Sequence, residues 1–339
     1  MKEKISNPKD LMKPTEHPLF DRLSEIIHSH QKFIITTHLL PDGDGLGGEV
    51  SLASYLKSLG KECQIMNADP TPEKFSLVDP DQEIEVWSER QKLLDAEIIF
   101  GIDVNDEKRI GKLLGFLKKL KVRLIFVDHH ILEEPLKNKH IVDPEVSSMG
   151  EFFYRYFQYV KADINFKMAL AMYVSLITDT QHFRHRKTTS LSHAIAAALV
   201  EIGVAPQFVH QMIHQTKSLG EMKLLGEVLR EVRSEAGGKI VWMEVSQEHQ
   251  RHYGVSAEET QGFADHLMRL KDAEVGMLFR EQEDSNIKVS FRSKGNVEIF
   301  PIVKKLGGGG HAYEAGTLLS GPMEKAVLQV LKEIKKLFS

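Results

Sequence analysis

A carboxylate and two imidazoles stand together in the triplet Asp128-His129-His130, directly after an apolar run. A similar group follows another apolar run, where His38, Asp42 and Asp44 lie within seven residues. Short apolar runs predict buried strands, and α/β proteins keep their chemistry in the loops that follow strands. These two groups are therefore candidates for one functional site.

Two further carboxylates belong with them. Asp103 ends the next predicted strand, and Asp179 follows an apolar helical stretch. Each acid alone is more often a helix cap or a turn residue. Because the ends of successive parallel strands meet at one edge of a sheet, however, five carboxylates and two or three imidazoles would share one crevice.

Carboxylates crowded in this way repel one another and shift their pKa values unless cations are present. Oxygen and imidazole ligands without thiolates suit Mn²⁺, with Mg²⁺ or Co²⁺ as alternatives. We therefore predict two divalent metal ions at this edge. A surface turn rich in Asp and Gly, with a nearby His, is the simpler alternative for residues 38–44.

The positioning elements alternate between strand and helix patterns. The predicted strands have near-continuous apolar character, which indicates burial on both faces and a doubly wound parallel sheet. They span residues 33–37, 63–67, 98–103, 123–128 and, more briefly, 141–143. Residues from about 150 to 230 are mainly helical in pattern, including the stretches 168–177 and 192–202.

A smaller α+β domain is predicted to follow Gly237-Gly238. Its predicted strands and helices are residues 239–245, 274–280, 287–292 and 317–319, and residues 257–270, 297–306 and 324–337. The whole organisation is an N-terminal arm, a catalytic domain, a helical linker and a substrate-binding domain, at residues 1–20, 21–195, 196–236 and 237–339. We expect the active site in the cleft between the two domains.

Composition narrows the class of protein. The 339 residues carry a formal net charge of -4, which argues against binding long duplex nucleic acid by bulk electrostatics. The single Cys63 excludes an internal disulfide and fits a reducing cytoplasm. The sequence has no apolar run of membrane-spanning length and no apolar signal segment at its start, so we expect a cytoplasmic protein without membrane contact.

A run of four glycines, 307–310, precedes His311 in the C-terminal part. Glycine lets backbone N–H groups approach a phosphate closely, and Arg292 and His311 could add charged hydrogen bonds. A flexible loop between a helix and a strand is the alternative.

These motifs, in this order, resemble the DHH phosphoesterase superfamily with its DHH-associated C-terminal domain, over nearly the whole chain beyond the arm. Within it, the length and compact second domain resemble the subgroup of oligoribonucleases (nanoRNases) and pAp phosphatases. The resemblance implies that one metal is held by His38, Asp42 and Asp103. It implies that the second is held by Asp44, Asp103, His129 and Asp179, with Asp103 bridging.

The resemblance also assigns roles beyond the metal ligands. His130 would face the scissile phosphate, and Asp128 would orient the histidines from behind. Arg184 would lie near the phosphate, although a solvated arginine is the alternative. Substrate would be bound by Arg292, Ser293, Gly308, Gly309, Gly310 and His311. A homodimer is compatible with the resemblance.

The implied function is the two-metal activation of water against short oligoribonucleotides, releasing mononucleotides, or against pAp, releasing AMP. A phosphodiesterase for linear or cyclic dinucleotides such as pApA or c-di-AMP is the enzymatic alternative. A nucleotide-binding regulator without catalysis is the alternative outside enzymes. Two positions depart from the family pattern: Gly48, where a small hydroxyl residue is common, and Gln181, where Gly is common.

Overall fold

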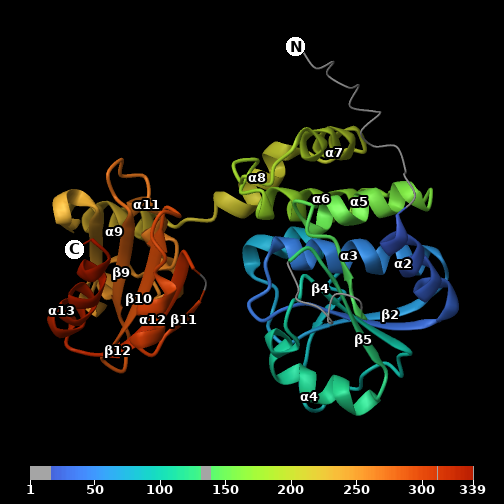
Figure 1. Cartoon of the computed structure of the whole chain (residues 1–339), viewed down its shortest axis with the longest axis horizontal. Coiled ribbons are helices and arrows are strands. Elements are labelled where there is room, and N and C mark those ends of the chain that lie inside the picture. The colour runs from blue at the N-terminus through green and yellow to red at the C-terminus, as the bar shows by residue number, and fades with distance from the viewer. Residues whose placement is uncertain (1–16, 131–138, 311, 339) are drawn as a thin grey trace, which may run out of the picture. The chain divides into compact units, whose positions relative to one another are not determined.

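The computed structural model describes residues 17–130, 139–310 and 312–338 (Figure 1). Residues 1–16 of the predicted arm and His311 therefore lie outside the described residues. The chain divides into two compact units, with the division between Thr216 and Lys217. Each unit has its own six-stranded sheet. The predicted cleft between them stays a prediction.

The N-terminal unit contains a parallel sheet in the strand order β3-β2-β1-β4-β5-β6, which confirms the predicted doubly wound α/β architecture. Its strands are β1 (Lys32–Thr36), β2 (Glu62–Asn67), β3 (Ile84–Val86), β4 (Ile98–Ile102), β5 (Arg123–Asp128) and β6 (Ile141–Val142). The central strand β4 is buried along its whole length, as its continuous apolar sequence predicted. The edge strand β3 was not predicted, because it has only three residues and none of them is buried.

Two layers cover this sheet. Phe33 and Ile35 of β1 pack into the core beneath the larger helices, whereas Ile34 between them packs on the opposite face against Leu113 and Leu117. The larger helices are α2 (Pro18–Ser29), α3 (Gly43–Ser58), α5 (Met149–Tyr159), α6 (Phe166–Asp179), α7 (Ser190–Glu201) and α8 (Pro206–His214). The opposite face carries α4 (Leu114–Leu117) with the 3₁₀ segments Glu107–Leu113 and Lys118–Leu120, as Figure 1 shows, and a further 3₁₀ segment spans Glu73–Val78.

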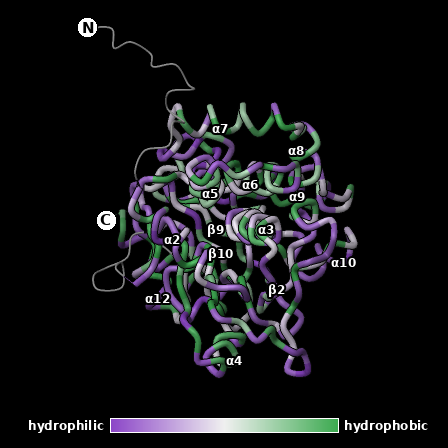
Figure 2. The backbone as a smooth tube through the Cα atoms, turned by 90° about the vertical axis from the view of Figure 1, so that its right-hand side faces the viewer, coloured by the Kyte–Doolittle hydropathy of each residue, from purple (hydrophilic) through white to green (hydrophobic). Residues whose placement is uncertain are grey.

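A helix that packs one face on the core and exposes the other has hydrophobic and hydrophilic residues interspersed along its sequence. Helix α2 carries hydrophobic and hydrophilic residues (Figure 2), and it buries Phe20, Leu23, Ile26 and Ile27. Residues 18–20 of the predicted arm are therefore helical. Within the described residues, no single helix has the length and apolar character needed to cross a bilayer. Helices α7 and α8 reach that length and composition only when they are taken together, and the pair is sharply bent.

The C-terminal unit has a mixed sheet in the order β11-β12-β10-β9-β8-β7, in which only the β8–β9 pair is parallel. Its strands are β7 (Arg233–Glu235), β8 (Ile240–Val245), β9 (Val275–Glu281), β10 (Asn286–Ser293), β11 (Gly309–Gly310) and β12 (Glu314–Ser320). Its helices are α9 (Leu219–Arg230), α10 (Gln247–Tyr253), α11 (Phe263–Leu267), α12 (Phe300–Lys305) and α13 (Met323–Ile334), with 3₁₀ segments at Ala236–Gly238, Glu258–Thr260 and Lys335–Leu337.

The residues of the predicted helical linker 196–236 are shared between the two units. Helix α8 packs in the first unit through Val209 and Ile213. Helix α9 packs in the second through Leu224 and Val228, against the face of the sheet opposite to α12 and α13. The residues predicted to form a linker therefore pack into one unit or the other, and the units divide between Thr216 and Lys217.

Candidate metal centre

The predicted ligands lie at the carboxyl ends of three neighbouring strands and at the ends of two helices. His38 follows β1, Asp103 follows β4 and His129 follows β5, and these strands are adjacent in the sheet. Asp42 is the N-cap of α3, where its Oδ1 accepts hydrogen bonds from two backbone N–H groups. Asp179 is the last residue of α6. The fold therefore gathers residues that are up to 141 positions apart in the sequence.

The first ligand group consists of His38, Asp42 and Asp103. The Nε2 atom of His38 lies 3.3 Å from Oδ2 of Asp103 and 3.9 Å from Oδ1 of Asp42. The Nδ1 atom lies 2.7 Å from the carbonyl oxygen of Leu39, so Nδ1 carries the proton and donates it to that oxygen. The Nε2 lone pair then faces the carboxylates, which is the orientation that metal-bound histidine requires.

The second ligand group consists of Asp44, His129 and Asp179, with Asp103 beside it. Nε2 of His129 lies 3.3 Å from Oδ2 of Asp44, 3.4 Å from Oδ2 of Asp179 and 3.6 Å from Oδ1 of Asp103. The two oxygens of Asp103 therefore face different groups, one toward His38 and the other toward His129. A bridging carboxylate has this arrangement.

Three atoms of this centre are buried without a hydrogen-bond partner: Asp44 Oδ2, Asp103 Oδ1 and His129 Nε2. Buried polar atoms are almost always paired, because an unpaired one loses its hydration without compensation. All three atoms point into the ligand groups, where a divalent cation would coordinate them. The donor set of carboxylate oxygens and imidazole nitrogens therefore fits two metal ions.

Protons compete with a metal for these ligands. Burial lowers the pKa of His129, but Asp44, Asp179 and Asp103 outweigh it and raise that pKa to about 9. Burial and the charge of Asp44 raise the pKa of Asp179 to about 8. Burial opposes ionisation of Asp103 as well, but the neighbouring His130 and His38 side chains and the charge of His129 hold its pKa below the usual range.

Metal binding at pH 7 is therefore expected to release protons, because metal-free His129 and Asp179 hold theirs at that pH and must lose them to coordinate. We expect on the order of one to two protons per chain when Mn²⁺ is added to metal-free protein in weak buffer. The release should decline as the pH rises through 8 to 9, and the apparent affinity for Mn²⁺ should rise over the same range. Binding of Mn²⁺ without proton release at pH 7 would contradict these ionisation states.

Asp128 is fully buried behind the two histidines. Its Oδ1 accepts hydrogen bonds from the backbone N–H of His129 at 2.7 Å, the backbone N–H of His130 at 3.2 Å and Nδ1 of His130 at 2.8 Å. His130 Nδ1 also lies 3.3 Å from Oδ1 of Asp103. Burial lowers the pKa of His130, but the neighbouring carboxylates of Asp103 and Asp128 raise it to about 10. In the metal-free protein these contacts favour the imidazolium form of His130, whose side chain is partly exposed.

Ser175, a fully buried residue of α6 whose hydroxyl donates a hydrogen bond to Oδ1 of Asp44, was not identified from the sequence. The backbone N–H of Met149 donates to the same oxygen at 2.9 Å. Together they fix Asp44 and leave its Oδ2 for the ligand group. Ser175 lies four residues before Asp179, on the same face of α6, and this spacing was the available signal.

Gly48, one of the two departures from the family pattern, has a steric reason. A Cβ at this position would lie 2.5 Å from Cγ2 of Ile102 on β4. Helix α3 therefore approaches the strand that leads to Asp103 more closely than a serine would allow. Gln181, the other departure, has a φ of 49°, a left-handed conformation for which glycine is usual.

Arg184 lies on the turn after α6, and its Nε donates to the carbonyl oxygen of Gln181 at 2.8 Å. It is exposed and belongs to neither ligand group. Its predicted contact with phosphate stays a prediction.

The predicted substrate residues lie on the C-terminal unit. Arg292 on β10 is held by carboxylates, with Nε 2.7 Å from Oδ1 of Asp265 and Nη2 2.7 Å from Oε1 of Glu314. The hydroxyl of Ser293 donates to the carbonyl oxygen of Val297 at 2.6 Å. A phosphate at Arg292 would therefore have to replace at least one ion pair.

Part of the glycine run forms β11, an edge strand paired with β12, so residues 309–310 are not a flexible loop. Close packing also requires glycine here. A Cβ on Gly308 would lie 2.3 Å from the carbonyl oxygen of Gly316, and one on Gly310 would lie 2.4 Å from Cα of Ala315. The glycines thus have a structural role in addition to the predicted contact with phosphate.

Comparison with known proteins matches both units. The DHH family, N-terminal domain, matches residues 32–178, and the DHHA1 domain matches residues 237–339. The bifunctional oligoribonuclease and PAP phosphatase NrnA of Thermus thermophilus is 27% identical over 337 residues, which cover 98% of this chain and 94% of that protein. The protein of the same name from Bacillus subtilis is 27% identical over 303 residues, which cover 87% and 91%.

Solved structures show the same architecture. An exopolyphosphatase-related protein from Bacteroides fragilis superposes with a TM-score of 0.86 at 25% identity, covering 94% of this chain and 97% of that one. RecJ from Thermus thermophilus in complex with Mn²⁺ superposes with a TM-score of 0.54 at 12% identity, covering 94% of this chain and 54% of that one. The second likeness concerns the fold alone.

Proposed function

The chain belongs to the DHH family and is a phosphoric ester hydrolase, and on that premise we propose that it uses two divalent metal ions to hydrolyse short oligoribonucleotides and pAp. The observation that carries the proposal is Asp103, a buried carboxylate whose two oxygens face two separate ligand groups. The substrate class rests on the relatives named as oligoribonuclease and PAP phosphatase.

The ligand types favour Mn²⁺, with Mg²⁺ or Co²⁺ as alternatives. His38, Asp42 and Asp103 would hold one ion, and Asp44, Asp103, His129 and Asp179 would hold the other. When bound, the two ions would supply the positive charge that activates a water nucleophile and neutralises the phosphoryl oxygens.

The residues of the chain orient this chemistry. The carbonyl oxygen of Leu39 fixes the His38 ring, and Ser175 with Met149 fixes Asp44. Asp128 holds His130 as an imidazolium whose exposed side can donate a proton or a hydrogen bond to a phosphoryl oxygen. Arg184 would add a second cationic donor once its guanidinium turns from Gln181.

A panel of substrates tests the proposal. Purified protein with Mn²⁺ should hydrolyse pAp and RNA of roughly two to five nucleotides much faster than RNA of twenty nucleotides, as expected if it shares the substrates for which its relatives are named. A preference for pApA or a cyclic dinucleotide would instead support the dinucleotide phosphodiesterase. Absence of hydrolysis with every member of the panel would support a catalytically inactive regulator.

On the C-terminal unit, we propose that Arg292, Ser293, Gly308, Gly309, Gly310 and His311 bind the nucleotide or its terminal phosphate. Arg292 is partly buried between Asp265 and Glu314 and can exchange one carboxylate for a phosphate. A cytoplasmic location and a homodimer remain predictions from the sequence.

Arg292→Ala is expected to raise the KM for pAp roughly tenfold or more while changing kcat little, since a charge-assisted hydrogen bond contributes about 1.5–3 kcal/mol. The matched control is Arg230→Ala on α9 of the same unit, where an exposed arginine pairs with Glu227 and Glu231. The control should keep the wild-type KM. An unchanged KM in Arg292→Ala would count against the proposed phosphate contact.

A further inference from the structure

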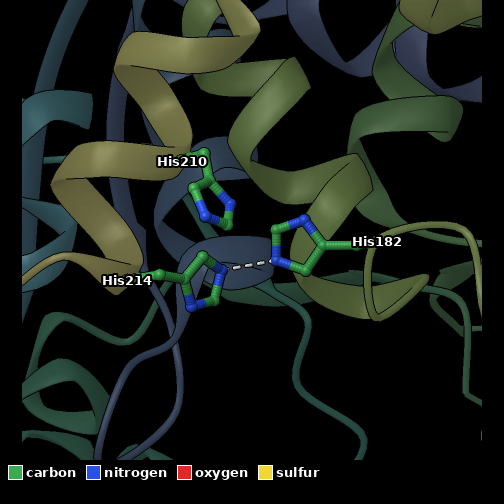
Figure 3. Close-up of side chains that lie close together, drawn as sticks. All are labelled: His182, His210 and His214. Atoms are coloured by element: carbon green, nitrogen blue, oxygen red, sulfur yellow. Dashed lines mark hydrogen bonds between the residues drawn. The ribbon is translucent and has the colours of Figure 1, made fainter.

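A second cluster of imidazoles lies outside the ligand groups described above. It consists of His182, in the turn after α6, and of His210 and His214 on α8 (Figure 3). One ring nitrogen of each residue lies within 4.8 Å of the other two. Nε2 of His214 is 2.5 Å from Nε2 of His182, and the rings of His210 and His214 are 4.9 Å apart. The cluster shares no residue with the ligand groups of the metal centre.

Rigid elements hold the three rings in place. His210 and His214 are four residues apart on α8, so they lie on one face of the helix. The neighbouring face buries Val209 and Ile213 in the core of the N-terminal unit, which anchors the helix. His182 reaches α8 because Gln181, His182 and Phe183 all have left-handed backbone conformations, with φ of 49°, 57° and 62°. Residues other than glycine seldom adopt this conformation, and here three do so in succession.

Two of the three imidazoles, those of His182 and His214, are held in the neutral form. Burial and the charges of His182, His210, Lys74 and Arg184 lower the pKa of His214 to about 4. Burial and the charges of His210 and Arg184 also lower the pKa of His182. A neutral imidazole has a free lone pair, which is the form that binds a metal. His182 and His214 hydrogen-bond to each other, and His210 takes no part in that bond.

Distances agree with a transition metal. A Zn²⁺ ion with Zn–N bonds of about 2.0–2.1 Å in a tetrahedral site separates its ligand nitrogens by about 3.3 Å. The nitrogens here range from 2.5 Å to within 4.8 Å, so rotations of these partly exposed side chains bring all three to that separation.

We propose that His182, His210 and His214 form a third metal site, which binds Zn²⁺ through three imidazoles and leaves one position open to water. Nitrogen ligands alone favour Zn²⁺ and its late transition-metal neighbours over Mn²⁺, Mg²⁺ and Ca²⁺. The nearby cations Lys74 and Arg184 repel every divalent ion to the same extent, so the selectivity comes from the nitrogen ligands. Bound zinc would tie the turn that follows Asp179, and that carries Arg184, to α8.

Zinc counting tests the site on the full chain. Protein stripped of metal is equilibrated with excess Mg²⁺ and a buffered low concentration of Zn²⁺, and the zinc bound per chain is measured by mass spectrometry after dialysis. His210→Ala and His214→Ala should each hold about one Zn²⁺ fewer than the wild type, and the double variant should lose no more than either. Both residues are exposed, so the variants should keep the wild-type circular dichroism.

His28→Ala is the matched control, because it removes an exposed helix histidine at the end of α2 and should leave the zinc content unchanged. Zinc that enters the carboxylate-rich centre contributes equally to every protein in the comparison and cancels. Equal zinc contents in the wild type and both cluster variants would overturn the proposal. The count is independent of hydrolysis, so failure of the proposed function would leave its result unaffected.

Discussion

Asp103→Asn is expected to abolish Mn²⁺-dependent hydrolysis while leaving the N-terminal sheet folded. Asp103 contributes one oxygen to each ligand group, so its loss affects both metal positions at once. Removing a single charge-stabilising group from an active site costs about 10²–10³ in kcat, and a bridging ligand should cost at least that much. Asparagine suits the position, because Asp103 has a φ of 56° and asparagine tolerates this left-handed conformation.

The measurements are kcat with Mn²⁺, bound manganese per chain and far-UV circular dichroism. The control is Asp106→Asn, three residues further along the same loop, where an exposed carboxylate caps a 3₁₀ segment. It should retain wild-type activity and metal content. Turnover at the wild-type level in Asp103→Asn, or two manganese ions still bound with full affinity, would contradict the dinuclear proposal.

Sheet geometry made it possible to predict that the candidate metal ligands would lie together. His38, Asp103 and His129 each follow an apolar strand, and in a parallel sheet these ends lie along one edge. Asp42 was also readable, since an aspartate before a helix is a common N-cap. Strand geometry did not account for Asp179, which follows a predicted helix; the packing of α6 against α3 brings it to Asp44 and His129.

Other features depended on long-range packing that local sequence does not encode. Helix α9 has an amphipathic pattern, but only its contacts with Val241 and Leu278 show that it belongs to the second unit. The glycine run could be read as a loop, because the pairing of Gly309 and Gly310 with β12 involves no side chain. The histidine cluster could not be predicted from local sequence for a similar reason. A left-handed turn brings His182 close to α8, a helix that begins 24 residues later in the sequence.

Substitution of Asp128 is expected to have the second large effect on activity and stability. Its Oδ1 accepts hydrogen bonds from two backbone N–H groups of the loop and from the His130 ring. In Asp128→Ala, the N–H groups of His129 and His130 lose their acceptor. Each polar group left unpaired costs about 1–3 kcal/mol, so the loss of two should lower the free energy of unfolding by about 2–6 kcal/mol. The kcat should fall about 10²-fold or more, since the His130 ring loses the hydrogen bond that orients it.

Asp128→Asn separates the two contributions. The amide oxygen can still accept from both backbone N–H groups, so the variant should be more stable than Asp128→Ala. The lost charge, however, lowers the pKa of His130, so the alkaline limb of kcat should move to lower pH. Asp143→Asn is the control, because Asp143 is a buried carboxylate that pairs with Arg155 and faces no ligand group. An alkaline limb unchanged in Asp128→Asn would show that His130 does not act as an acid.

The same pKa shift sets the direction of the pH dependence of stability in metal-free protein. The folded-state pKa of His130 is raised above its unfolded value, so its stabilising contribution is complete below about pH 6.5 and is lost as the pH rises toward 10. Asp128→Asn should therefore destabilise the metal-free protein most at pH 6 and progressively less between pH 7 and 10. Denaturant unfolding across that range measures the difference. A difference that grew with pH would mean that Asp128 does not favour protonated His130 in the folded state.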